Sequence, residues 1–413
     1  MLISCIALLI GIELPVMQND DLEFLNCRNM LHAIEHDLAT PSRAQVAQHL
    51  GLSRTATSML AQKLLKAGLI TELESLKRGR GRPGTPLTLD EQVWHALGAA
   101  FYSGAWNFLI INLVGKIVES KRIAVNSTDQ HEVIEALITG LIEIQRSTSH
   151  TLLPGYGIGA PGLVDNLTGS IYRADDLGWK EIIPLKQIIE GRTGKQALVI
   201  NRYRANGLAE IRFGNHSGKH NVIYLGIGTG IAGSIYLDQE LMNSTNYRIG
   251  HMVIDPHGPL CGCGQRGCLQ AMAGEGALLS FVHHRKAEQP TYLAELTDDH
   301  LTGAAIAALA EEGNEDAREA LRHIAEPIAI AVSTLANAIA PDEVIIGGPL
   351  GDLSSYLVDR VRAKVYDRIL DWQATHLTIL KGTQGHYGPA IGAATYVLNN
   401  KMDLIFGQGC SER

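Results

Sequence analysis

The hydrophobic positions of the first ninety residues repeat at helical spacing. Apolar side chains recur three or four residues apart over residues 23–37, and Leu60, Leu64 and Leu65 share one side of residues 54–67. Between these segments a cap-like Thr-Pro-Ser sequence precedes a short helix at 43–50, Gly51 makes a turn, and Ser53 can cap the next helix. This order predicts a helix-turn-helix, whose last helix enters the DNA major groove.

Two short apolar segments follow, at 69–74 and 86–89, and predict the paired strands of a wing. Between these segments, Arg78, Arg80 and Arg82 alternate with glycines, and a proline follows Arg82. An extended cationic ribbon of this kind fits the narrow minor groove of A·T-rich DNA. A small helical bundle followed by a solvated basic linker is the alternative for this region.

The predicted DNA-binding residues fall into three groups. Small polar side chains near the start of helix 54–67 would contact base edges, arginine and lysine on that helix would contact phosphates, and the wing arginines would enter the minor groove. The residues are Ser53, Arg54, Thr55, Thr57, Ser58, Gln62, Lys63, Arg78, Arg80 and Arg82.

From Trp94 the pattern changes to an alternation of strands and helices that is typical of α/β proteins. Glycine-rich loops follow several of the predicted strands, which lie at 96–100, 107–118, 156–165, 197–200, 221–225, 234–237 and 342–348. The predicted helices lie at 131–147, 302–311, 315–338 and from 388 to 398.

Composition adds a charge asymmetry to this picture. The chain has 413 residues, 46% of them hydrophobic, and a net charge of −8, which indicates a globular protein of two or three domains. Residues 41–89 contain eight basic and two acidic residues, so a basic module is attached to an acidic body, as in proteins that bind polyanions.

The apolar N-terminal segment and the spacing of the cysteines indicate where in the cell the protein is expected. Residues 1–16 are almost wholly apolar, but they are too few to span a bilayer and lack the features of a signal peptide. We expect the natural chain to begin near Met17. Cys5, Cys27 and Cys410 are too widely spaced for a disulfide framework, which favours a reducing cytoplasm and no membrane association.

Half of the six cysteines lie within eight residues, at Cys261, Cys263 and Cys268, downstream of His251. Three thiolates and one imidazole complete a tetrahedral zinc shell and leave no open position for water, so the predicted zinc is structural. His257 is an alternative fourth ligand. A glycine-rich turn with incidental cysteines is the alternative to a metal site.

Together these motifs resemble the ROK family of repressors and sugar kinases. The resemblance runs from about residue 23 to 400 and is carried by the helix-turn-helix, the Gly-Arg-Pro wing, Gly-Ala-Pro-Gly at 159–162, Leu-Gly-Trp at 177–179, Gly-Thr-Gly-Ile at 228–231, Gly-His at 250–251, the cysteine cluster and Gly-Gly at 347–348. It implies an actin-like body of two lobes, a structural zinc, and homodimers or tetramers. The basic head places the chain with the sugar-responsive repressors of the N-acetylglucosamine and xylose type.

On this resemblance the chain divides into four parts. They are an apolar tail at 1–20, a winged helix-turn-helix at 21–90, a small α/β lobe at 91–202 plus 388–401, and a large α/β lobe with the zinc loop at 203–387.

The chain departs from the family's kinases at two positions. The resemblance implies an aspartate for ATP phosphates where this chain has Ala100, and a catalytic aspartate where it has Arg202. An arginine is always charged and cannot accept the proton of a sugar hydroxyl. We therefore expect no kinase activity, and a sugar kinase with an added DNA-binding head is the alternative.

At the predicted effector site, acidic residues of the family pattern are also replaced by residues that are not acidic. Two glutamates of the family pattern are replaced by Arg248 and Gln270, and the remaining implied positions are Asn201, Arg202 and His251. Two arginines in one cleft would repel each other unless an anion or a buried acid lies between them. We expect an anionic effector, such as a sugar phosphate or sugar acid. The alternative is a decayed pocket in which both arginines pair with internal acids.

The expected function is that of a transcriptional regulator, more specifically a repressor of carbohydrate genes that reads an A·T-rich, pseudo-palindromic site as a dimer. Besides the kinase alternative, a protein partner rather than a small molecule could release it from DNA.

Overall fold

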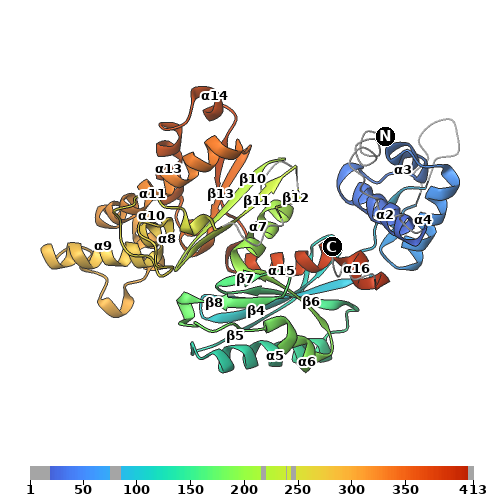
Figure 1. Ribbon diagram of the computed structural model, residues 1–413, viewed down its shortest axis with the longest axis horizontal. Helices are drawn as coiled ribbons and strands as arrows, with labels where there is room; N and C mark the ends of the chain where they lie inside the picture. Colours follow the sequence, from blue (N-terminus) through green and yellow to red (C-terminus); the bar gives the residue numbers. More distant parts are fainter. Residues whose placement is uncertain (1–18, 75–84, 215–219, 239, 243–247, 408–413) are drawn as a thin grey trace, which may run out of the picture. The chain divides into compact units, whose positions relative to one another are not determined.

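The computed structural model describes residues 19–74, 85–214, 220–238, 240–242 and 248–407. The chain forms two compact units that divide after Trp94 (Figure 1). The division falls after Trp94 rather than after residue 90, because the Trp94 indole N–H donates a 2.7 Å hydrogen bond to the Ala67 carbonyl. Residues 91–94 are thus tied to the N-terminal unit. Residues 1–18 of the expected apolar tail fall outside the described residues, and residues 19 and 20 already belong to the first described helix.

In the described residues of the N-terminal unit there are three helices, a π-helical turn and two strands. They are α2 (Asn19–His32), the turn Ala33–Asp37, α3 (Arg43–Leu50), α4 (Arg54–Lys66), β1 (Ile70–Glu72) and β2 (Leu87–Leu89).

Local capping sets the helix boundaries of this unit. The Ser42 hydroxyl accepts a hydrogen bond from the Gln45 N–H while the Gln45 side chain accepts one from the Ser42 N–H. Gly51 ends α3 with a φ of 66°, a left-handed conformation that glycine adopts without a Cβ clash. Ser53 then caps α4 by accepting from the Ala56 N–H.

The two strands pair antiparallel, with Ile70 opposite Leu89, and pack against α4 and the π-helical turn. Buried apolar side chains come from all three helices and both strands, and include Met30, Leu31, Val46, Leu60, Leu64, Ile70 and Leu87. These elements fit the predicted helix-turn-helix and its two following strands.

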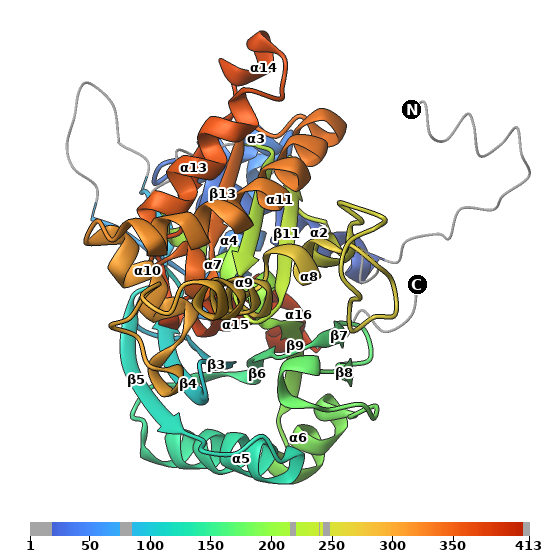
Figure 2. The same ribbon diagram turned by 90° about the vertical axis from the view of Figure 1, so that its left-hand side faces the viewer.

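The body begins with a five-stranded sheet. Its order is β5 (Ile117–Ala124), β4 (Ala105–Asn112), β3 (His95–Tyr102), β6 (Leu152–Ala160), β9 (Gln196–Asn201). β3, β4 and β5 are antiparallel, whereas β6 and β9 run parallel to β3. Helices α5 (Gln130–Ser147) and α6 (Leu185–Thr193) cover one face (Figure 2).

A short hairpin follows β6, made of β7 (Leu163–Asp165) and β8 (Ser170–Arg173), and a 3-10 turn, η2 (Asp175–Leu177), comes next.

A second five-stranded sheet forms the other lobe. Its order is β12 (Glu240–Leu241), β11 (Ile231–Leu237), β10 (Val222–Ile227), β13 (Glu343–Gly347), β14 (Thr378–Lys381). β10, β13 and β14 are parallel, and β11 and β12 are antiparallel additions. The helices that follow its strands are α8 (Leu269–Ala273), α9 (Glu275–Glu288), α10 (Gly303–Glu311), α11 (Glu315–Ile339), α12 (Gly348–Gly351), α13 (Ser355–Tyr366) and α14 (Asp371–Ala374), with 3-10 turns η3 (Ile249–His251), η4 (Asp298–His300) and η5 (Gly385–Tyr387).

Apolar side chains of α8, α9, α10, α11 and α13 pack with this second sheet in a large core. Helix α11 has 25 residues but is amphipathic and begins with two acidic residues. Within the described ranges, none of the helices combines the length and apolar character that crossing a membrane requires.

Helix α15 (Gly388–Asn399) lies on the face of the first sheet opposite α5 and approaches it closely. A Cβ placed on Gly98 of β3 would lie 2.3 Å from the Ala390 carbonyl oxygen, and one on Gly157 of β6 would lie 1.9 Å from that of Ala393. The glycines therefore allow helix backbone to rest directly on strand backbone.

Helix α7 (Arg202–Phe213) packs on the second sheet, where Tyr203 and Leu208 share a buried cluster with Tyr224. It also packs against α15 so closely that a Cβ on Gly392 would lie 1.6 Å from the Ala205 carbonyl oxygen. The α7–α15 pair thus joins the two sheets.

The two-lobed α/β body and its actin-like arrangement agree with expectation, and a second boundary differs from the expected one. Helix α16 (Lys401–Phe406) continues the small lobe past residue 401, because Leu404 packs beside Gly155 of β6.

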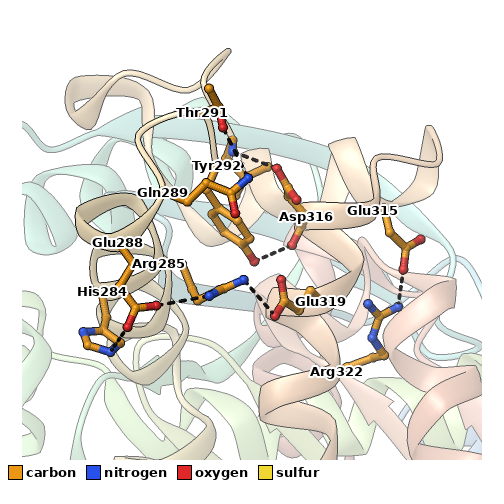
Figure 3. A network of polar contacts seen from close by, with 11 residues as sticks. His284, Arg285, Glu288, Gln289, Thr291, Tyr292, Glu315, Asp316, Glu319 and Arg322 are labelled. Carbon is orange, nitrogen blue, oxygen red and sulfur yellow. Dashed lines mark hydrogen bonds and ion pairs between the residues drawn. The ribbon is translucent and has the colours of Figure 1, made fainter.

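Polar contacts also connect α9 to α11 (Figure 3). Arg285 bonds Glu288 at 3.1 Å and pairs with Glu319 at 3.5 Å, while the buried Tyr292 hydroxyl donates to the Asp316 carbonyl at 2.7 Å. These partly exposed ion pairs are worth little individually, typically 0–1 kcal/mol. The apolar core and the α7–α15 contact are therefore expected to dominate stability.

We predict that Gly392→Ala destabilises the protein by about 3 kcal/mol or more, since the new methyl group would force α7 and α15 apart. Gly276→Ala is the matched control, because nothing lies within 4 Å of its Cβ position in α9. That control should be neutral or stabilise by up to about 1 kcal/mol. Urea unfolding of both variants measures this; equal stabilities would contradict the proposed packing role of Gly392.

Candidate ligand cavity, metal centre and nucleic-acid interface

A cavity of about 570 Å³ lies between the two lobes of the body. The first lobe contributes the β7–β8 hairpin and η2, and the second contributes the start of α7, the turn between β10 and β11, η3 and the cysteine loop. All five residues predicted to bind an effector line it, namely Asn201, Arg202, Arg248, His251 and Gln270.

Asn201 shapes the cavity wall as the N-cap of α7. Its side-chain oxygen accepts from the N–H groups of Tyr203 and Arg204 at 2.9 and 3.2 Å. Its amide nitrogen donates to the Gly162 carbonyl at 2.7 Å. These bonds tie the start of α7 to the glycine turn after β6, so Asn201 positions the wall and its acceptor oxygen is already used.

Arg202 is buried, with 7% of its surface exposed. Its guanidinium pairs with Asp176 of η2 at 2.6 Å and donates a longer bond of 3.4 Å to the Phe101 carbonyl. For Arg202 the alternative of pairing with an internal acid therefore holds, because Asp176 neutralises it.

Arg248 behaves differently. Its side chain is exposed and lines the cavity, and among the described residues it has neither an ion-pair nor a side-chain hydrogen-bond partner. Gln270, which also lines the cavity, is neutral, and its side-chain oxygen accepts a hydrogen bond from the Ile231 N–H at 3.3 Å. Arg248 is therefore a guanidinium in the cavity wall that the described acids do not compensate, and neutral amide groups line the same cavity.

The candidate metal centre borders the cavity. One ligand atom from each of His251, Cys261, Cys263 and Cys268 lies within 4.8 Å of the others. The Nδ1 of His251 is 3.6 Å from the Cys261 sulfur, so His251 rather than His257 joins the three thiols.

The chemistry of this group suits a cation. Burial and the nearby Arg248 charge lower the pKa of His251, which favours the neutral imidazole that binds metals. Burial and the neighbouring thiols raise the pKa of Cys268 to about 12. A bound metal ion would displace that proton and relieve repulsion between thiolates.

Three residues that sequence reasoning missed connect these parts. Arg173 pairs with Asp175 at 2.5 Å and donates to the Gly262 carbonyl of the cysteine loop at 3.2 Å. Asp176, the next residue, holds Arg202. The two acids directly precede the Leu-Gly-Trp motif at 177–179, which was the available signal.

The candidate nucleic-acid interface is the exposed side of α4. Ser53, Arg54, Thr55 and Gln62 are exposed and Ser58 is partly exposed, as contact with a groove requires.

The prediction that Thr57 contacts DNA is wrong. It is fully buried and its hydroxyl donates to the Ser53 carbonyl at 3.0 Å, because it shares the core-facing side of α4 with Leu60 and Leu64. Thr57 therefore cannot reach a base edge. Met59 was missed: it is 66% exposed on the opposite side, among the polar residues predicted for DNA contact.

The predicted phosphate contacts have different surroundings. Lys63 pairs with Glu23 at 2.7 Å, so a phosphate would have to compete with that carboxylate. Arg54 is exposed at the start of α4. The wing arginines Arg78, Arg80 and Arg82 fall outside the described residues.

Comparisons with known proteins agree with this geometry. The model of the ROK family matches residues 104–400. The chain belongs to the ROK family.

Among relatives, it is 26% identical to the xylose repressor of Caldicellulosiruptor bescii over 372 residues, which cover 88% of this chain and 93% of that protein. It is 29% identical to the glucokinase of Streptomyces coelicolor over 305 residues, which cover 72% of this chain and 90% of that one. A solved ROK family transcriptional regulator, described as a homologue of Escherichia coli Mlc, has the same fold, with a TM-score of 0.79 at 22% identity over 94% of this chain and all of the other.

The sequence resemblance aligns Ala100 and Arg202 with two aspartates of ROK kinases, and the structure shows where both residues lie. Ala100 is buried within β3, and β3 turns directly into β4 through Ser103 and Gly104, which both have positive φ. This is the tight two-residue hairpin geometry that pairs antiparallel strands. Arg202 begins α7 and is held by Asp176. Neither position offers a carboxylate to a metal or a sugar hydroxyl.

We predict that Asp176→Asn destabilises the protein by about 3 kcal/mol, because removing one partner leaves the buried Arg202 charge uncompensated. The adjacent Asp175→Asn removes a partner from an ion pair in which both side chains are about 40% exposed, and should cost under about 1 kcal/mol. Thermal unfolding of the two variants measures the contrast. A similar small cost for both would show that the Asp176 pair contributes no more than a surface pair.

Proposed function

We propose that this ROK protein is a DNA-binding transcriptional repressor of carbohydrate-metabolism genes, and that a sugar-derived effector in the interlobe cavity changes its affinity for DNA. The observation that carries the proposal is the helix-turn-helix unit attached to a ROK body with Ala100 and Arg202 at the kinase positions. The xylose repressor matches 88% of the chain, which is more than the body alone and supports the same reading.

In this proposal α4 enters the major groove. Thr55, Ser58 and Gln62 contact base edges, with Ser53 at the helix start, while Arg54 and Lys63 contact phosphates. The arginines of the wing enter an A·T-rich minor groove. Two heads of a homodimer or tetramer read a pseudo-palindromic operator in the cytoplasm.

The cysteine loop holds a structural zinc ion in the same proposal. Three thiolates and one imidazole complete a tetrahedral shell, and this donor set is the one that structural zinc sites use. The residues present fit the ion, and its contribution is to hold the loop beside Arg248 and Gly262 rigid. No catalytic step is assigned to it.

The enzyme alternative is a ROK sugar kinase with an added head. Phosphoryl transfer needs metal-bound phosphates and an oriented hydroxyl nucleophile. A buried alanine and an ion-paired arginine supply neither, which favours the regulator. A regulator released from DNA by a protein partner is the third alternative.

The direct test selects bound fragments from random duplex DNA and then screens metabolites for their release. We expect recovery of an A·T-rich palindromic sequence and its release by a sugar derivative. Absence of selected DNA at low ionic strength would reject the proposed function. Release only by a cellular protein would favour the partner alternative.

We predict that Met59 contacts a thymine methyl group. Removing one such contact corresponds to about 0.8 kcal/mol, or about fourfold in affinity. Replacing the contacted thymine with uracil should therefore weaken the wild-type complex about fourfold and leave the Met59→Ala complex unchanged. Fluorescence anisotropy with uracil at each operator position measures this. The prediction fails if uracil affects both proteins equally at every position.

We predict that the purified protein carries one zinc ion per chain and that Cys268→Ser loses it. Cys27→Ser is the control, since Cys27 is buried in the N-terminal unit and lies outside the cluster. Metal analysis by mass spectrometry and thermal unfolding with and without a chelator measure the outcome. Retention of zinc by Cys268→Ser, or its loss from Cys27→Ser, would contradict the assigned ligands.

A further inference from the structure

The charges around the cavity do not cancel. Arg173 pairs with Asp175, and Arg202 pairs with Asp176, so each of these arginines has its own carboxylate. Arg248 is left without an acidic partner among the described residues. The cavity wall therefore carries a positive charge that the described protein groups do not balance.

This arrangement differs from that of many arginines on the body. Arg192 pairs with Glu135, Arg322 with Glu315 and Arg362 with Asp359, each within 2.7 Å. A guanidinium that lines a concave site without such a partner is a ready acceptor for an oxyanion, which it can bind through two parallel hydrogen bonds.

A second unmet donor lies in the same wall. The Nε of Arg202 is buried and has no acceptor among the described residues, although the terminal nitrogens of that guanidinium are bonded. Burying such a donor without a partner is costly. Because the Arg202 Nε is itself buried, the group that can meet a ligand's acceptor oxygen is the exposed guanidinium of Arg248.

The idea that the pocket has decayed predicts that both arginines pair with internal acids. That description fits Arg202, which Asp176 compensates. It does not fit Arg248, whose side chain is exposed to the cavity.

We propose that the cavity binds a sugar derivative bearing an oxyanion, either a phosphate ester or a carboxylate, and that Arg248 is the residue that binds this group. The proposal rests on the regulatory function above and names the chemical class of its effector. Gln270 and the turn at Thr229 and Gly230 supply neutral polar groups for sugar hydroxyls on the same wall.

Such binding would act on the metal loop directly. The carbonyl of Arg248 accepts the backbone N–H of His251 at 2.9 Å within η3, and His251 belongs to the metal cluster. An oxyanion bound to Arg248 would therefore act on η3, the 3-10 turn that also contains the proposed metal ligand His251. The cavity and the loop are connected by three residues of backbone.

The test is isothermal titration calorimetry on the full, zinc-loaded chain with glucose, glucose 6-phosphate, gluconate and inorganic phosphate. Glucose 6-phosphate or gluconate should bind at least tenfold more tightly than glucose, a difference of about 1.4 kcal/mol. The Arg248→Gln variant should remove that advantage, and Arg248→Lys should restore part of it. The control Arg266→Gln changes an exposed arginine of the metal loop outside the cavity lining and should change nothing.

Folding of each variant is checked by its zinc content and thermal midpoint, which should match the wild type because Arg248 is exposed. The proposal is overturned if glucose binds more tightly than both acidic probes, if none of the probes binds, or if Arg248→Gln retains the full preference. Binding of inorganic phosphate as tight as that of glucose 6-phosphate would also overturn the sugar-derived class.

The same proteins are assayed for binding to the selected operator. Operator binding that glucose releases, without any preference for acidic probes, would reject only the assignment of an anionic effector. Failure of every variant and of the wild type to bind DNA would instead reject the regulatory function.

Discussion

The close contact between α7 and α15 is the constraint on which the body depends. Gly392 lets the backbone of α15 approach that of Ala205, and Gly98 and Gly157 let the other side of α15 rest on the first sheet. Because α7 packs on the second sheet, this contact fixes the lobes relative to each other within the body. It also fixes where α7 begins, and therefore where Asn201 and Arg202 meet the cavity.

Other interactions position the cavity wall that the cysteine loop and η2 form. The cysteine cluster and the bond from Arg173 to Gly262 hold the loop, and the Asp176–Arg202 pair connects η2 to α7. A ligand in the cavity would thus contact segments from both lobes. A regulator needs such a site, because a ligand shifts an equilibrium only by its difference in affinity for the two states.

Features set by neighbouring residues could be predicted from the sequence. The caps at Ser42 and Ser53 and the turn at Gly51 act within a few residues, so α3 and α4 begin and end as expected. The cysteine spacing likewise brings three thiols together, although the choice of His251 over His257 needed the structure. Family motifs identified which residues would line the cavity.

Features set by packing between distant segments could not be predicted in the same way. Asp176 lies 26 residues before Arg202 on a short turn, so the sequence left open whether an internal acid pairs with Arg202 and could not name that acid. Thr57 and Met59 are two residues apart on α4, yet only the core of the unit decides that Thr57 is buried and Met59 exposed. Polar type alone therefore misassigned one of them and overlooked the other.

We propose that this ROK body recognises a ligand without transferring phosphate to it, because the sequence resemblance puts Ala100 and Arg202 at the positions of two kinase aspartates. The most direct measurement is ADP production by the zinc-loaded protein with Mg-ATP and a panel of neutral hexoses and pentoses. The account predicts that no sugar raises the rate above background. Sugar-dependent turnover on the order of 1 s⁻¹, in the range of ordinary enzymes, would contradict it.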